Sequence, residues 1–185
     1  MAYPTLVHRA LDFAAMAHRT QLRKSPEAQI PYVSHCAGVA LLLARHGFAD
    51  EVVAAGALHD VLEDTEITAA ELEKAFGARV LFLVQSCSEP DKSVPWEERK
   101  ARYIAHVRVA EPDARAISAC DKLHNMRSMI HAVHAGFDPF AQMKRGRDLQ
   151  LDRFHRFADA LADGWSHPLV DEVRETLREL EAVLS

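Results

Sequence analysis

Apolar residues recur three and four positions apart along most of the chain, which is the spacing that puts them on one face of an α-helix. In the first such stretch Leu6, Ala10 and Phe13 share a face, whereas residues 21–34 break the period with charged residues and prolines. The pattern predicts helices over residues 4–19, 34–46, 50–64, 68–77, 78–88, from 95 onwards and over 112–135, followed after Pro139 by two or three amphipathic helices interrupted at Gly164.

Capping residues fall at the ends of these predicted helices. Thr68 and Glu71 have the spacing of a capping box, and Pro95 and Pro112 stand where a helix can begin. No internal repeat, linker or low-complexity segment divides the sequence. We therefore expect residues 1–185 to form one all-α domain that is long enough to bury a sizeable core.

Composition narrows the classes of function. The 185 residues are 49% apolar and 26% charged, and their formal net charge of −5 favours neither nucleic-acid nor membrane binding. The sequence shows no secretory signal, no apolar run near the length of a membrane-spanning helix and no lipidation motif. Cys36, Cys87 and Cys120 are isolated, which is typical of reduced structural thiols. These features predict a cytoplasmic protein with no nucleic-acid or membrane partner.

The densest group of ionisable residues lies in an apolar run that begins at Val52. On a helix that turns about 100° per residue, four of them fall within an arc of about 140°, with the apolar residues of segment 58–64 on the opposite side. Carboxylates this close raise one another's pKa values, and a bound cation relieves their repulsion. The pattern favours a metal site, and the alternative is a solvated acidic face with a stray histidine. The four residues are His59, Asp60, Glu63 and Asp64.

Two distant residues are candidates to complete such a site. His35 lies at the start of a predicted helix, although a lone histidine on a helix is more often a core or surface residue. Asp121 follows a nearly uncharged stretch, 116–120, that should be buried, and a buried carboxylate needs a partner. Asn125 and Ser128 follow Asp121 by four and seven residues, so all three project from one helix face. Such a face is more typical of a binding site than of a packing surface.

Four motifs carry a resemblance to a known family. They are residues 17–25 (AHRTQLRKS), 31–35 (PYVSH), 57–65 (ALHDVLEDT) and 121–128 (DKLHNMRS). Together they resemble the HD superfamily of metal-dependent phosphohydrolases, and within it the hydrolase domain of the RelA/SpoT family, which removes the 3′-pyrophosphate from the alarmones ppGpp and pppGpp. The likeness covers about residues 5–135 and lacks the synthetase domain of the long family members. The chain is similar to the stand-alone small alarmone hydrolases, including those of metazoans.

The resemblance implies a fold, a metal and a set of site residues. The fold is a single HD-domain helical bundle, with the motif core in residues 5–135 and further helices in 136–185. The metal is one divalent ion, usually manganese, and a set of two imidazoles and two carboxylates suits such an ion. The implied ligands are His35, His59, Asp60 and Asp121; the implied catalytic pair is Glu63 and Asp64; and the implied contacts to the guanosine are Arg23, Lys24 and Ser25 on one wall and Asn125 and Ser128 on the other.

Three positions depart from the family pattern. Residues 26–30 lengthen the spacing from Arg23 to His35 relative to bacterial bifunctional enzymes, as in the metazoan-type proteins, which leaves base specificity less defined. Cys36 stands where a proline is usual, and Ser128 stands where threonine is common. Neither change removes a group that the chemistry needs.

Other polar and aromatic residues have simpler interpretations. We expect the basic residues after Glu89 to form an ordinary charged helix face, of which one or two members approach the phosphates; they are Lys92, Arg99, Lys100 and Arg102. His131 and His134 fit a solvated helix end, and Trp96 and Trp165 fit packing positions.

Three functions are compatible with these features. The resemblance favours metal-dependent hydrolysis of ppGpp or pppGpp to GDP or GTP plus pyrophosphate. Another nucleotide phosphohydrolase on the same fold, acting as a nucleotidase or on the 2′-phosphate of NADPH, needs the same metal and carboxylates. A catalytically silent nucleotide-binding regulator is the third, and the intact Glu63-Asp64 pair counts against it. The sequence leaves open the preference among ppGpp, pppGpp and NADPH, the oligomeric state, and which member of the pair is the base.

Overall fold

The structure is a computed structural model that describes residues 5–24, 29–89, 93–141, 143 and 145–185. Within these ranges the chain is helical, with one isolated antiparallel bridge between Leu22 and Pro31, so the predicted all-α fold class is confirmed. No helix in the same ranges has both the length and the apolar character needed to cross a membrane. The helices are α1 (Thr5–Ala17), α2 (Val33–Arg45), α3 (Asp50–Leu58), α4 (Val61–Asp64), α5 (Ala69–Phe76), α6 (Ala78–Cys87), α7 (Trp96–Val107), α8 (Pro112–His134), α9 (Arg147–Ala162) and α10 (Pro168–Val183).

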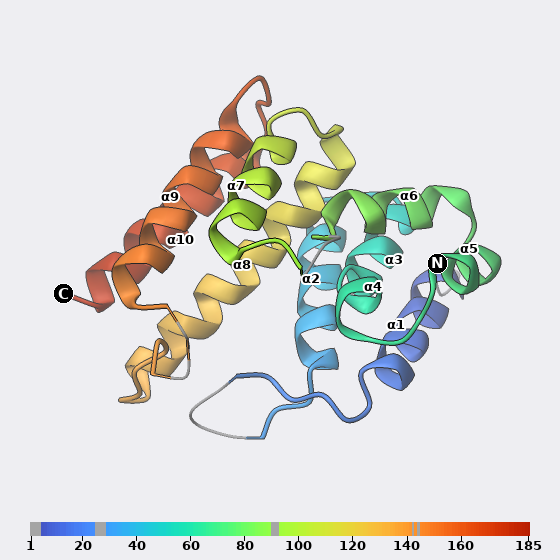
Figure 1. The fold of residues 1–185 in the computed structure, drawn as a ribbon, viewed down its shortest axis with the longest axis horizontal. Helices are drawn as coiled ribbons and strands as arrows, with labels where there is room; N and C mark the ends of the chain where they lie inside the picture. The colour runs from blue at the N-terminus through green and yellow to red at the C-terminus, as the bar shows by residue number, and fades with distance from the viewer. Residues whose placement is uncertain (1–4, 25–28, 90–92, 142, 144) are drawn as a thin grey trace.

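Helix α8 crosses the middle of the molecule and organises the other helices around it (Figure 1). It packs against α10 on one side and against α2, α3 and α6 on the other. The helices α1 to α6 lie together on one side of α8, and α9 and α10 lie on the other, with α7 packed against α9 (Figure 1). Side chains on α8 can therefore meet residues from both ends of the sequence.

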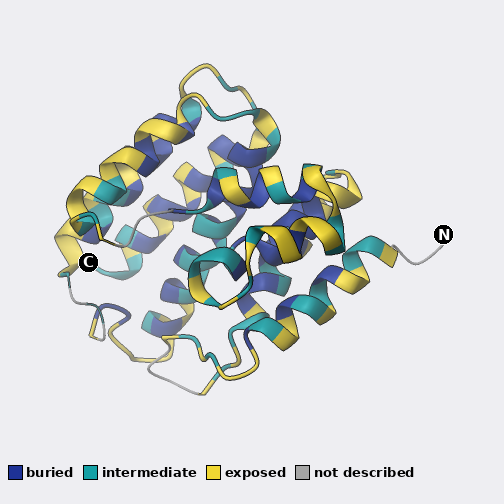
Figure 2. Ribbon diagram, turned by 45° about the vertical axis from the view of Figure 1, so that its right-hand side comes forward, coloured by how far each residue is buried: buried dark blue, intermediate teal, exposed yellow. Residues whose placement is uncertain are grey.

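The buried residues lie along the sides of the helices that face one another (Figure 2), and their apolar side chains form one core. Residues 52–58 of α3 and residues 114–120 of α8 are buried without interruption, as expected for the nearly uncharged stretch before Asp121. A Cβ atom added to Gly56 would lie 2.3 Å from Cδ1 of Leu43, so glycine allows α2 and α3 to approach closely at this point.

Helix ends follow the local signals in the sequence. The Thr68 side chain accepts a hydrogen bond from the Glu71 amide, and Glu71 Oε2 accepts one from the Thr68 amide at 2.9 Å, so the predicted capping box is confirmed. Pro112 occupies the first turn of α8. The C-terminal residues form two helices, α9 and α10, which are separated around Gly164 as predicted.

The prediction of one continuous helix over residues 50–64 is wrong. Helix α3 ends at Leu58, and a separate short turn, α4, begins at Val61. Nδ1 of His59 lies 2.8 Å from the carbonyl oxygen of Gly56, which can only accept a hydrogen bond. The imidazole therefore donates to an oxygen that the helical hydrogen-bond pattern would otherwise use. The break occurs at the histidine and aspartate that the sequence marks as candidate metal ligands.

Ionic contacts fasten the C-terminal helices to the rest of the molecule. The Glu172 carboxylate of α10 lies 2.6 Å from Nη2 of Arg127 on α8 and 2.7 Å from Nε2 of His46, just after α2. The largely buried Arg115 of α8 donates to the carbonyl oxygen of Asp163 at 2.6 Å. These contacts fix α10 and the end of α9 against α8.

Two leucines on α2 provide a test of the core. Leu43 is fully buried, whereas Leu41 is 70% exposed. We expect Leu43→Ala to lower the free energy of unfolding by about 2–5 kcal/mol, because removing buried methyl groups leaves a cavity. Leu41→Ala, on the same helix, should change it by less than about 0.5 kcal/mol. Urea denaturation measures both values, and equal losses would contradict the orientation of α2.

Candidate metal and nucleotide site

Four polar side chains converge where α2, α3 and α8 meet. His35 comes from the first turn of α2, His59 and Asp60 from the break after α3, and Asp121 from the middle of α8. The Nε2 atoms of the two histidines are 3.2 Å apart, and Asp121 Oδ1 lies 3.2 Å from His35 Nε2. Asp60 Oδ2 lies 3.0 Å from His59 Nε2 and 3.6 Å from His35 Nε2. The structure thus brings together the four residues predicted as ligands, which we call the ligand cluster.

The ligand cluster has the donor chemistry of a divalent metal site. Ligand atoms of His35, His59 and Asp121 all lie within 4.8 Å of one another. Because His59 donates through Nδ1 to the Gly56 carbonyl, the lone pair on its Nε2 faces the cluster. Imidazole nitrogens and carboxylate oxygens held at this spacing suit a first-row divalent ion. The residues present therefore fit the kind of metal that the sequence motifs imply.

The electrostatics of the cluster favour positive charge. Burial lowers the pKa of His59, but the carboxylates of Asp60 and Asp121 outweigh burial and raise this pKa to about 9. Burial likewise raises the pKa of Asp121, yet Lys122 and the two histidines hold it well below its usual range. Carboxylates that raise the pKa of a neighbouring imidazole in this way provide the negative potential that a cation site needs.

Neighbouring side chains orient the two carboxylates. Tyr32 Oη donates to Asp60 Oδ2 at 2.5 Å. Asn125 Nδ2 donates to Asp121 Oδ1 at 2.6 Å, and Lys122 Nζ lies 2.5 Å from Asp121 Oδ2. Each carboxylate is therefore fixed by at least one partner outside the ligand cluster.

A histidine on α8 orients the first ligand of the cluster. His124 Nδ1 lies 2.9 Å from Nδ1 of His35, so the two rings share a hydrogen bond and Nε2 of His35 points at the cluster. A Cβ atom added to Gly38 would lie 2.1 Å from the His124 ring. The glycine on α2 therefore makes the space that this supporting ring occupies.

The candidate catalytic pair follows the helix break. Burial and the charges of Asp60 and Glu89 raise the pKa of Glu63 to about 7. Asp64 is more exposed, and its Oδ2 accepts a hydrogen bond from Gln21 Nε2 at 3.1 Å. Both carboxyl groups line the cavity around the ligand cluster, where a group that accepts a proton from water has to lie.

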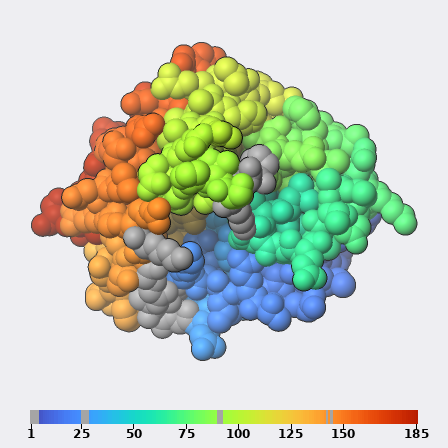
Figure 3. All heavy atoms as spheres, viewed as in Figure 1, coloured from blue at the N-terminus to red at the C-terminus, as the bar shows by residue number. Residues whose placement is uncertain are grey.

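Two cavities meet at this point. A cavity of about 320 Å³ is lined by His59, Asp60 and Asp121 of the ligand cluster, and a larger one of about 680 Å³ lies beside it. The space-filling view shows a hollow near the centre of this face, between α7, α9 and the N-terminal segments (Figure 3). Four residues line both cavities and form what we call the shared wall: Lys24, Tyr32, Asp64 and Asn125.

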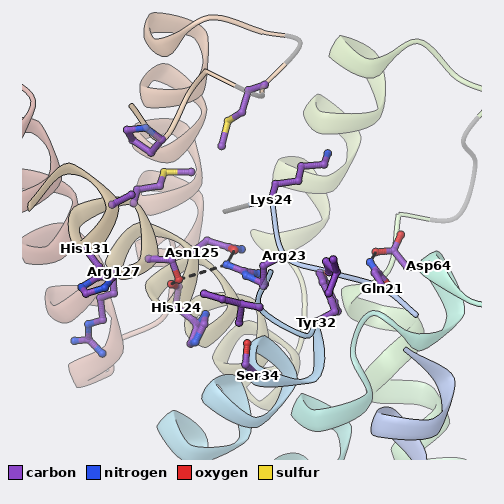
Figure 4. A pocket seen from close by; sticks show the side chains of 17 residues that line it. Gln21, Arg23, Lys24, Tyr32, Ser34, Asp64, His124, Asn125, Arg127 and His131 are labelled. Carbon is purple, nitrogen blue, oxygen red and sulfur yellow. Dashed lines mark hydrogen bonds between the residues drawn. The ribbon is translucent and has the colours of Figure 1, made fainter. Parts of the chain in front are cut away.

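Residues predicted to contact the guanosine line the larger cavity (Figure 4). Arg23 Nη2 lies 3.1 Å from Asn125 Oδ1 and 3.4 Å from Ser128 Oγ, which joins the two walls predicted from the sequence. The Arg23 guanidinium carbon lies 5.8 Å from the centre of the Tyr32 ring. Lys24 lines both cavities, whereas Ser25 lies outside the described residues.

The smaller cavity has charged walls that the predicted site residues did not include. Lys122 directly follows Asp121 in the 121–128 motif, and this position in the sequence could have marked it as a site residue. Lys100 belongs to the charged helix face from which one or two approaches to the phosphates were expected. Arg153 lies on α9, where the amphipathic pattern carries no signal of a site. Glu89 and the polar Tyr103 also line this cavity and were not among the predicted site residues.

Sequence comparison relates this site to known proteins. A protein-family model described as an HD domain matches residues 10–145. The human protein named guanosine-3′,5′-bis(diphosphate) 3′-pyrophosphohydrolase MESH1 is 35% identical over 177 residues, which cover 95% of this chain and 88% of that protein. The protein of the same name from Drosophila melanogaster is 39% identical over 176 residues, with coverage of 94% and 88%.

Structural comparison agrees with the sequence matches. A solved metazoan orthologue of SpoT, described as hydrolysing ppGpp, matches with a TM-score of 0.82 and 31% identity, covering 96% of this chain and 97% of the other. A protein from Listeria monocytogenes matches with a TM-score of 0.72 and 37% identity, covering 84% and 97%. Since the family model and these relatives each match most of the chain, this protein belongs to the HD-domain family, alongside the metazoan SpoT-type pyrophosphohydrolases.

Proposed function

We propose that this chain is a metal-dependent hydrolase that removes the 3′-pyrophosphate group of ppGpp or pppGpp. The observation that carries the proposal is the continuity between a buried ligand cluster suited to a divalent metal and a larger cavity suited to a nucleoside. The human and Drosophila relatives bear the name of this activity. The predicted substrate is thus a small guanine nucleotide.

The free thiols and the net charge bear on the cellular compartment and partners of the enzyme. Cys36, Cys87 and Cys120 are all free and buried, which suits a reducing compartment, so we infer that the enzyme works in the cytoplasm. The net charge of −5 gives no general attraction to nucleic acid. We infer that residues 1–185 act as one domain, because α8 packs against helices from both ends of the chain.

We assign the metal, for which manganese is our first choice, to the four residues of the ligand cluster. A bound divalent metal supplies a Lewis acid that polarises a phosphoryl oxygen and lowers the pKa of a nearby water. Tyr32 and Asn125 hold the two ligating carboxylates through hydrogen bonds, and His124 holds the ring of His35. These supports keep the donor atoms in place before the substrate arrives.

Hydrolysis needs two proton transfers, and we assign both to Glu63 and Asp64. A bond forms between the oxygen of water and the proximal phosphorus, while the bond from that phosphorus to the 3′ oxygen breaks. The attacking water loses a proton and the 3′ oxygen gains one. The raised pKa of Glu63, about 7, suits a group that both accepts and returns a proton near neutral pH.

The guanosine contacts are assigned to the larger cavity. The planar guanidinium of Arg23, held by Asn125 and Ser128, can stack on a purine and donate hydrogen bonds at its edge. Lys24 faces both cavities, so we place it near the junction between the ribose and its phosphates.

A substrate panel tests the proposed function. Purified protein with manganese should hydrolyse ppGpp to GDP and pyrophosphate faster than it releases phosphate from NADPH or nucleoside monophosphates. Faster release from NADPH would favour the alternative phosphatase on this fold. Binding of ppGpp without turnover, with each of several divalent metals, would favour the silent regulator.

The first prediction concerns the metal. Asp121→Ala should purify without the metal, whereas Asp113→Ala should retain it, because Asp113 lies on the same helix but pairs with Arg79 away from the site. Chelation should destabilise the wild type by about 2.7 kcal/mol where free metal had been a hundredfold above Kd, or roughly 5–10 °C in Tm. Metal analysis and thermal unfolding measure these effects. Full metal content in Asp121→Ala would show that Asp121 is not a ligand.

The second prediction concerns the catalytic pair. Glu63→Gln and Asp64→Asn keep the side-chain shape but cannot accept a proton, so each should lower kcat by about 10²–10⁴ with metal content and folding intact. Glu66→Gln, on the exposed segment after α4, serves as the control and should retain activity. Single-turnover hydrolysis of ppGpp, with metal analysis of the same samples, measures this. Near-normal turnover in both variants would remove the pair from the mechanism.

The third prediction concerns recognition of the base. Arg23→Ala removes a stacking plane and a charge but no metal ligand, so it should raise KM for ppGpp before it lowers kcat, the pattern of lost uniform binding. Arg19→Ala is the control, because Arg19 is exposed and contacts only the Met16 carbonyl in its own turn among the described residues. An unchanged KM in Arg23→Ala would contradict the assigned base contact.

A further inference from the structure

Three basic side chains line the smaller cavity without lining the larger one. Lys100 comes from α7, Lys122 from α8 and Arg153 from α9. None of the three lines the larger cavity, whereas Arg23 lines only that one. Three helices therefore contribute positive charge to the smaller cavity alone.

Two of these three cations are already paired with carboxylates. Lys122 Nζ lies 2.5 Å from Asp121 Oδ2 and 5.2 Å from the centre of the Tyr103 ring. Lys100 Nζ is in close contact with Oε1 of Glu89, which is itself 7% exposed. The positive charges of both lysines are therefore largely neutralised by these carboxylates.

Arg153 differs from both lysines. Its guanidinium carbon lies 5.3 Å from the centre of the Phe154 ring and 5.9 Å from that of Trp96, and it makes no hydrogen bond or ion pair with any residue in the described part of the chain. The aromatic rings hold the charge in place through cation–π contacts but leave its N–H donors unused. A half-buried guanidinium that lines the cavity and meets no acceptor among the described residues can bind an anionic ligand there.

The electrostatics connect Arg153 to the reaction centre. Burial lowers the pKa of Arg153, and the carboxylates of Asp121 and Glu89 oppose that shift. A guanidinium stays protonated at any physiological pH, so the side chain presents a full positive charge to the cavity. Arg153 therefore interacts electrostatically with Asp121 of the ligand cluster, although it comes from the C-terminal region of the chain.

The two cavities determine which part of the substrate meets this charge. With the guanosine in the larger cavity and the proximal 3′ phosphorus at the ligand cluster, the 3′ chain continues into the smaller cavity. The next group along that chain is the terminal phosphate of the 3′-pyrophosphate. The planar fork of an arginine matches two oxygens of a phosphate group.

We propose that Arg153 binds the terminal phosphate of the 3′-pyrophosphate group, and that it makes the enzyme select a diphosphate over a single phosphate at this position. This inference rests on the proposed function, because it takes the orientation of the nucleotide from it. Arg153 is a specificity-determining residue in this scheme, and proton transfer stays with Glu63 and Asp64.

The test compares two nucleotides that differ only by the terminal 3′ phosphate. We would measure kcat/KM for ppGpp and the inhibition constant of guanosine 5′-diphosphate 3′-monophosphate against it. Arg153→Met, which keeps an unbranched apolar stem between the rings, should lower kcat/KM for ppGpp by about 10- to 100-fold, the effect of losing a hydrogen bond to a charged group. The inhibition constant of the monophosphate should not change measurably.

Arg156→Met is the matched control. Arg156 lies on the same helix, its side chain is 57% exposed, and it faces Asp152 at 3.8 Å, so its loss should alter neither constant. Arg153→Lys keeps the charge but loses the fork, and it should lower kcat/KM for ppGpp less than Arg153→Met does. It also provides a folded variant in case the methionine impairs packing, which thermal unfolding and metal content would reveal.

Three outcomes would count against the proposal or its basis. Equal losses for both nucleotides in Arg153→Met would mean that Arg153 holds a group common to both, such as the 5′-diphosphate, and would overturn the inference. An unchanged kcat/KM for ppGpp would overturn it as well. Failure of the wild type to hydrolyse ppGpp would reject the proposed function itself, which is a separate result.

Discussion

Two largely enclosed carboxylates impose the main constraint on this fold. Asp60, in the break after α3, and Asp121, on α8, approach the same pair of imidazoles, and withdrawing their charges from water is costly unless positive charge accompanies them. The same two carboxylates raise the pKa of His59, which is the direction expected beside concentrated negative charge. The surrounding helices must therefore hold four side chains from α2, the end of α3 and α8 within a few ångströms of one another.

Several irregular features follow from this constraint. The helix break at residues 59 and 60 turns an imidazole and a carboxylate toward one point, which a continuous helix would not do with the same contacts. Gly38 leaves room for the His124 ring that supports His35. Helix α8 contributes Asp121 of the ligand cluster, its contacts Lys122 and Asn125, and several residues that line the larger cavity, so its position affects both cavities. The C-terminal helices matter to the site because they fix α8 and supply Arg153.

Much of this arrangement could be predicted from the sequence. The helical period, the capping box at Thr68 and the uncharged stretch before Asp121 identified the elements, and the four motifs brought together residues that the structure also gathers. The break after Leu58 was missed because a periodicity argument cannot see an imidazole that takes a backbone acceptor from its own helix. Arg153 was missed because it lies outside the four motifs, and only tertiary packing shows that it contacts Trp96 and Phe154 and lines the smaller cavity.

The shared wall has a consequence for how such an enzyme can diverge. Lys24, Tyr32, Asp64 and Asn125 each line both cavities, and Tyr32 and Asn125 also donate hydrogen bonds to the carboxylates of the ligand cluster. A substitution there alters the fit of the nucleotide and the geometry of the ligand cluster together, so it is expected to be costly. Residues such as Met129 line only the larger cavity and do not also donate hydrogen bonds to those carboxylates. Drift in base preference can therefore accumulate on that side of the site while the hydrolytic centre stays unchanged.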